Sequence, residues 1–311
     1  MKKMTNTSHI EGLVYEHKLE LRESGPNSKK PGTKFIMGTL DIATDDACTN
    51  IVPVHFTYVT ATTAKGATNA TFTTLMNIID GKYGSVMANG KESAAKVRID
   101  SALALNEFYT DRNGEEELVS VKRNEGGFVH IVDHLAEDET LRNTFKCDML
   151  ITGVKEVEAD EERKLPAKAI VRGAIFDFRG SLMPVEFSAV NPNAINYFVG
   201  LDASNANPTF TCIWGRQVSE TIIREIRTES AFGEDEVREV KNTRKDFVIT
   251  GASKEPYIWD DASTLTANEV AEAVAARETY LATVKARQDE YKASKNAAPA
   301  AATPAKGGFN F

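Results

Sequence analysis

The sequence predicts a mainly β protein: two tandem five-stranded barrels, each with a short helix, then a C-terminal α-helix and a disordered tail. One reason is a repeated pattern. The segments IVPVHFTYV (51–59) and LMPVEFSAV (182–190) share the spacing Pro-Val-x-Phe-x-x-Val. The segments around both copies also repeat in the same order, which favours a duplicated unit over chance. The composition then changes near residue 264, where a helical segment begins.

Strand-like runs surround both copies of the pattern. Apolar and polar residues alternate in these runs, as they do in half-buried strands. The runs before each copy are 10–21 and 35–43, then 150–160 and 171–178. A short helical segment and two more runs follow each copy: 71–80, 96–109 and 117–132, then 192–201, 210–226 and 245–252. Both second runs contain an interior glycine, Gly38 or Gly173.

Three strands, a helix and two strands make the order of the OB-fold, a small Greek-key barrel. We therefore predict a flexible N-terminus at 1–8, one OB-like domain at 9–135 and a second at 144–257. The alternative is an antiparallel β-sandwich of another topology, in which the shared pattern is only a common strand pattern.

The alternation also predicts which side chains are buried. One face of the first repeated strand should carry four residues: Val52, Val54, Phe56 and Tyr58. Lys122 and Arg123 are interpreted as a solvated turn, with phosphate contact as the alternative.

The C-terminal segment 264–295 is helical in composition. Apolar residues recur there at heptad spacing, interrupted by Arg277 and Gln288. We expect this helix to pack on a barrel or on a partner, with self-association into a homo-oligomer as the lesser alternative. The tail 296–311 has low complexity and is predicted to be disordered.

Composition excludes several classes of protein. The net charge of −8 argues against a generally basic binding protein, although a basic groove on an acidic body stays possible. The three cysteines stand far apart, which predicts neither a disulfide framework nor a zinc site. No signal peptide and no long apolar run is present, so we expect a cytoplasmic protein, in the host cytoplasm if it is viral.

Motifs for catalysis are lacking. No phosphate-binding loop, GxSxG or HExxH sequence occurs, so we predict no enzyme, no cofactor and no metal. The cluster His130, Asp133 and His134 is interpreted as a polar strand end. Asp41, Asp45 and Asp46 form a small acidic group that could bind a cation, but they are interpreted as turn residues.

The segments EGLVYEHKLEL (11–21), FIMGTLDIATDD (35–46) and IVPVHFTYV, with a polar linker and a terminal phenylalanine, resemble phage-type single-stranded DNA-binding proteins. The resemblance implies OB barrels that bind single strands in replication or recombination. It also implies a tail tip that recruits partner proteins, here through Phe309 and Phe311. The family's tails usually carry several acidic residues, and the tip GGFNF has none.

A single-strand binder needs cations for the phosphates and aromatic faces for the bases. Trp214 and Arg216 lie two residues apart, on one side of a predicted strand, with the alternative that Trp214 is core. The other candidates, chosen on the same grounds, are Lys34, Phe35, His55, Lys96, Arg98, Arg172, Phe178 and Arg179.

Two other functions stay open on the sequence alone: a structural virion β protein and a strand-annealing recombination protein. A stripe of basic and aromatic residues across both barrels would favour single-strand binding, whereas a scattered distribution would favour a structural role. A stacking surface accepts DNA or RNA, so the sequence does not separate these ligands.

Overall fold

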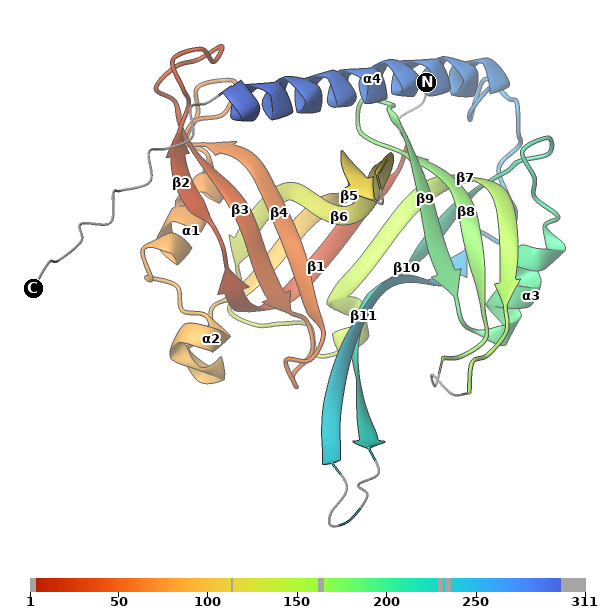
Figure 1. Cartoon of the computed structure of the whole chain (residues 1–311), viewed down its shortest axis with the longest axis horizontal. Helices are drawn as coiled ribbons and strands as arrows, with labels where there is room; N and C mark the ends of the chain where they lie inside the picture. Colours follow the sequence, from red (N-terminus) through yellow and green to blue (C-terminus); the bar gives the residue numbers. More distant parts are fainter. Residues whose placement is uncertain (1–3, 113, 162–164, 229–231, 233–235, 298–311) are drawn as a thin grey trace, which may run out of the picture.

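A computed structural model describes residues 4–112, 114–161, 165–228, 232 and 236–297. The chain is mainly β with a long C-terminal helix, which confirms the predicted class (Figure 1). Most of the predicted disordered tail, including Phe309 and Phe311, lies outside the described residues.

The first half contains one circuit of paired strands. Its elements are β1 (Asn6–His17), β2 (Glu20–Glu23), β3 (Lys34–Ala43), β4 (Ile51–Thr60), α1 (Ala70–Ile79), α2 (Val86–Asn89), β5 (Lys96–Arg112) and β6 (Glu115–Ile131). Antiparallel pairs join β1 to β3, β3 to β4, β6 to β5 and β5 to β1. A parallel pair between β4 and β6 closes the circuit.

The second half repeats this arrangement. Its elements are β7 (Asn143–Val157), β8 (Lys168–Phe176), β9 (Leu182–Ala189), α3 (Pro192–Gly200), β10 (Thr209–Thr228) and β11 (Glu236–Ala252). Antiparallel pairs join β7 to β8, β8 to β9, β11 to β10 and β10 to β7, and β9 pairs in parallel with β11. Helix α3 begins after the cap Asn191, whose side chain accepts a hydrogen bond from the Asn193 backbone.

One sheet runs through both halves, because β1 pairs with β7 as well as with β5. A buried polar cluster lies at this junction. The side-chain amides of Asn124 on β6 and Gln217 on β10 donate to each other, both over 2.8 Å. The Ser8 hydroxyl on β1 donates to the Asn124 oxygen over 2.8 Å. Three strands from two halves are therefore held by side chains that have no access to water.

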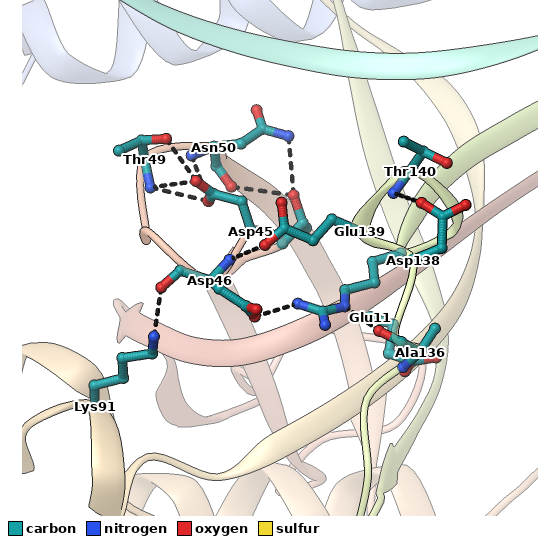
Figure 2. Close-up of polar contacts among 12 residues, drawn as sticks. Glu11, Asp45, Asp46, Thr49, Asn50, Lys91, Ala136, Asp138, Glu139 and Thr140 are labelled. Carbon is teal, nitrogen blue, oxygen red and sulfur yellow. Dashed lines mark hydrogen bonds and ion pairs between the residues drawn. The ribbon is translucent and has the colours of Figure 1, made fainter.

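The segment between the halves is also held by polar contacts (Figure 2). The buried Arg142 guanidinium donates to the Asp46 carboxylate and to the Ala136 carbonyl, each over 2.6 Å. The Asp46 backbone amide in turn donates to Glu139 over 2.6 Å. Asp45 accepts from backbone amides of its own loop, as a turn residue does. In the described part of the chain, no group of three or more His, Cys, Asp or Glu is placed to hold a metal ion.

The repeated strands supply both hydrophobic cores. Val52, Val54 and Phe56 are buried in the first half. Their counterparts Met183, Val185 and Phe187 are buried in the second half.

Tyr58, predicted to share the buried face, is 52% exposed, so this prediction was wrong. The register with β3 shifts between Ile36 and Gly38, which puts an extra residue into β4 and interrupts the alternation.

Helix α4 (Ala267–Ala297) lies across one end of both halves (Figure 1). Its first turns pack Val270 and Ala273 against an apolar cluster of the second half. Further along, the Arg277 guanidinium pairs with Glu107 of β5 over 2.5 Å. Gln288 accepts from the Tyr109 amide and donates to the Tyr109 carbonyl. The two polar interruptions of the heptad pattern therefore dock the helix on its own chain.

None of the described helices combines the length and the apolar composition that crossing a membrane would require.

Glycine spacing gives a test of this packing. A Cβ atom built on Gly173 of β8 would lie 2.0 Å from the Leu150 carbonyl oxygen, whereas one built on Gly153 of β7 meets nothing within 4 Å. We expect Gly173→Ala to lower the free energy of unfolding by about 1–3 kcal/mol, because the backbones of β7 and β8 must move apart to make room for the new methyl group. Gly153→Ala is the matched control and should change it far less. Urea unfolding of both variants measures this, and equal stabilities would contradict the predicted clash.

Candidate nucleic-acid interface

Two adjoining hollows form a groove between the halves. One, of about 580 Å³, lies on the outer face of β8 and β9. The other, of about 510 Å³, lies beside β4, β6 and the middle of β10 and β11. Both are lined by Ser120, Lys122 and Asp246, so they are neighbours. We call this surface the groove. Its charged lining residues and histidine are His55, Lys122, Arg123, Lys168, Arg172, Glu186, Lys245 and Asp246.

Lys122 occupies the centre of the groove. Its ammonium lies 4.6 Å from the ring centroid of Phe187 and 4.8 Å from that of Phe247. It also donates to the Glu186 carbonyl, so a residue of the first half contacts the second. Burial lowers the pKa of Lys122 to about 8, although Asp246 and Glu186 act in the opposite direction. The prediction of a solvated turn was wrong, because Lys122 lies within the long strand β6.

Other cations of the groove are paired with carboxylates. Arg172 contacts Glu186 over 2.7 Å, and Lys168 contacts Asp246 over 3.5 Å. Lys245 is exposed beside them. A bound phosphate could therefore take the place of a carboxylate as the partner of a cation.

His55 is a hydrogen-bonding group of the groove and not a cation. Its Nδ1 lies 3.2 Å from the Thr39 hydroxyl. Burial, and then the nearby Arg123, lower the pKa of His55 below its ordinary value, so the ring is neutral at pH 7.

An aromatic pair lies on the outer face of β3 and β4. The rings of Phe35 and Tyr58 are 4.6 Å apart between centroids, with 37° between their planes. Lys34, the first residue of β3, is exposed next to Phe35. The predicted residues Lys34, Phe35 and His55 therefore come from two paired strands, β3 and β4. Two of the predicted residues, His55 and Arg172, line the groove.

Four other predicted residues lie on the opposite side of the sheet. Trp214 and Arg216 are on β10, and Arg98 is on β5 with Lys96 at its start. Trp214 is 40% exposed, so the alternative that it belongs to the core is wrong. None of these four lines either hollow.

Phe178 and Arg179 belong to neither surface. They lie in the turn between β8 and β9, where the Arg179 guanidinium is 5.0 Å from the Phe178 ring centroid. Phe178 is 81% exposed.

Sequence reasoning did not select Lys122, Lys168 and Lys245 of the groove, Tyr58 of the aromatic pair, or Phe128 on β6, which is 69% exposed. Only Phe128 could have been found from the local pattern. It precedes the buried Val129 on β6, and successive side chains of a strand point to opposite faces, so alternation indicates an exposed ring. The position of Lys122 depends on contacts between the halves, which no local pattern records.

The low pKa of Lys122 predicts a pH dependence of stability. Between pH 8 and the ordinary pKa of 10.5, the unfolded chain holds a proton that the folded chain has lost. The free energy of unfolding should therefore rise with pH in this window. Relative to Lys122→Met, which cannot titrate, the wild type should gain about 2–3 kcal/mol. Urea unfolding of both proteins at pH 7.5 and 10.5 measures the gain, and parallel pH profiles would contradict it.

Two of the solved structures to which this chain is similar are forms of one protein. The wild-type single-stranded DNA-binding protein from Thermus aquaticus has 10% sequence identity and a TM-score of 0.45, over 82% of this chain and 95% of that one. A deletion mutant of that protein also has 10% identity and a TM-score of 0.45, over 85% of this chain and 100% of the other. No curated protein matches the sequence significantly. The model of the YorF family matches residues 5–287, which is most of the chain, so this protein belongs to the YorF family.

Proposed function

We propose that the protein binds single-stranded DNA in the groove, with little preference for sequence. The observation that carries the proposal is the position of the groove. It runs along outer faces of β4 in the first circuit and of β8 and β9 in the second. We infer that each circuit is an OB-like barrel and that the two are a tandem duplication. Oligonucleotides bind OB barrels on the face of the second and third strands, which are these strands.

The groove and the aromatic pair of Phe35 and Tyr58 together offer both kinds of contact that a single strand needs. Lys122, Lys168, Arg172 and Lys245 can neutralise phosphates, which displaces counterions and makes binding dependent on salt. Tyr58, half exposed and beside Phe35, offers a ring on which a base can stack. No pattern of paired donors and acceptors for base edges follows from these residues, so we propose binding that tolerates any sequence.

The role that fits such binding is protection of displaced strands in replication or recombination, in a phage as the resemblance implies. The protein would act by binding alone, with no catalytic step and no cofactor. Phe309 and Phe311 remain proposed contacts for replication or recombination proteins.

Two exposed cations of the groove test the proposal. Arg172 and Lys245 come from different hollows, and the double variant Arg172→Ala/Lys245→Ala removes two positive charges. We expect weaker binding of labelled oligo-dT and a decrease of about 1.4 in the slope of log K against log[salt], since each phosphate contact contributes about 0.7. Fluorescence anisotropy from low to physiological salt gives the slope.

The matched control is Lys82→Ala/Arg287→Ala, which removes the same charge from exposed positions outside the groove. An equal loss in both variants would mean that only the net charge matters. An unchanged slope in the groove variant would contradict the proposal. Oligo-U in place of oligo-dT decides between DNA and RNA.

A further inference from the structure

The side of the sheet that faces away from the groove carries a continuous row of side chains across both halves. The strand registers place Phe128 opposite Asp100, Asp100 opposite His9, His9 opposite Thr144 and Thr144 opposite Arg216. The row crosses β6, β5, β1, β7 and β10, which spans roughly 19 Å at the usual strand spacing. It exists only because β1 and β7 join the halves into one sheet.

Neighbouring rows add cations and a second aromatic ring. On one side, Arg98 lies opposite His130. On the other side, Lys146 lies opposite Trp214. We call these rows the back face. Its members are Thr7, His9, Arg98, Asp100, Phe128, His130, Thr144, Lys146, Trp214 and Arg216.

Both aromatic rings of the back face are accessible. Phe128 is 69% exposed and Trp214 is 40% exposed. The Trp214 ring covers Gly251 of β11: a Cβ atom added there would lie 2.3 Å from the indole Nε1. Because Gly251 has no side chain, part of the indole packs on the backbone there, and the rest of the ring stays exposed.

The charge of the back face is mainly positive. Arg98, Lys146 and Arg216 are its formal cations. Two carboxylates lie beside these cations. Asp100 is 3.0 Å from the His9 ring and 3.9 Å from Arg98, and the largely buried Glu11, opposite Arg98, is 3.5 Å from His9. On a chain with a net charge of −8, this concentration of cations between exposed aromatic rings complements a polyanion with stacking bases.

No residue of the back face lines either hollow of the groove. Side chains of one strand alternate between the two sides of the sheet. His9 therefore points away from its neighbour Ser8, which is buried with Asn124 and Gln217 between the halves. The two surfaces come nearest on β10, where Val218 of the groove lies two residues beyond Arg216.

We propose that the back face is a second surface for single-stranded DNA, so that one chain holds two strands at once. The inference rests on the proposed function, because it assigns the groove to the first strand. Held on opposite sides of one sheet, two strands are brought within a molecular diameter of each other. The protein then bridges strands as well as covering them, which is the step that precedes their pairing.

The two tryptophans, Trp214 and Trp259, make the test specific. In full-length protein carrying Trp259→Phe, the remaining indole fluorescence reports on the back face alone. We would titrate it with oligo-dT of about eight nucleotides, a length suited to one OB-type site. The expected result is two oligonucleotides per chain and quenching of Trp214. A mixture of donor-labelled and acceptor-labelled oligo-dT, which cannot pair, should show energy transfer.

Variants assign each site separately. In this Trp259→Phe protein, Arg98→Ala/Arg216→Ala should reduce the stoichiometry to one oligonucleotide per chain. The affinity measured from the quenching of Trp214 should fall by about tenfold or more. In otherwise unchanged protein, Trp214→Ala should also reduce the stoichiometry to one oligonucleotide per chain. Trp214→Phe, which keeps an aromatic ring, should bind two. Arg172→Ala/Lys245→Ala should remove the other oligonucleotide and leave the quenching. Tyr280→Ala, which removes an exposed ring from α4, is the control and should keep both sites.

The remaining outcomes each overturn one or both proposals. One oligonucleotide per chain without quenching, lost in the groove variant, would overturn the back-face proposal and leave the groove intact. One oligonucleotide with quenching, insensitive to the groove variant, would overturn the groove and the two-strand model. No binding at low salt would overturn both.

Discussion

The reciprocal amide pair of Asn124 and Gln217 sets the relation between the two halves. Both side chains are buried, so a shift of either strand would leave donors and acceptors without water or partner, at a cost of about 1–3 kcal/mol for each group. The Gln217 carbonyl also accepts from Asn50 of the first half and from Asn143 of β7. One residue of β10 thus fixes a strand, a loop and the start of the second circuit.

This junction explains how far the sequence could predict the structure. Alternation and the repeated Pro-Val-x-Phe pattern predicted the strands and their order, because these depend on neighbours within a few residues. The burial of Tyr58 was predicted wrongly because a single extra residue in β4 reverses the alternation. The grouping of Arg98 with Trp214 could not be predicted, since it depends on the pairing of β1 with β7 across more than a hundred residues.

The placement of charge follows from the same architecture. For the proposed function, an acidic protein that binds a polyanion must confine its cations to surfaces that the ligand reaches. In the groove, Arg172 and Lys168 are held by Glu186 and Asp246, which fixes their geometry and limits attraction at a distance. In the proposed complex, a phosphate that enters the groove would replace a carboxylate as the partner of a cation.

The docking of α4 has a consequence for synthesis. The helix follows both circuits in the chain, and domains emerging from a ribosome fold from the N-terminal end. Glu107, whose carboxylate is 2% exposed once Arg277 has paired with it, must therefore wait for the last described helix to be translated. Until then the Glu107 carboxylate lacks this cation, so we expect that end of β5 to stay hydrated until the helix has been translated.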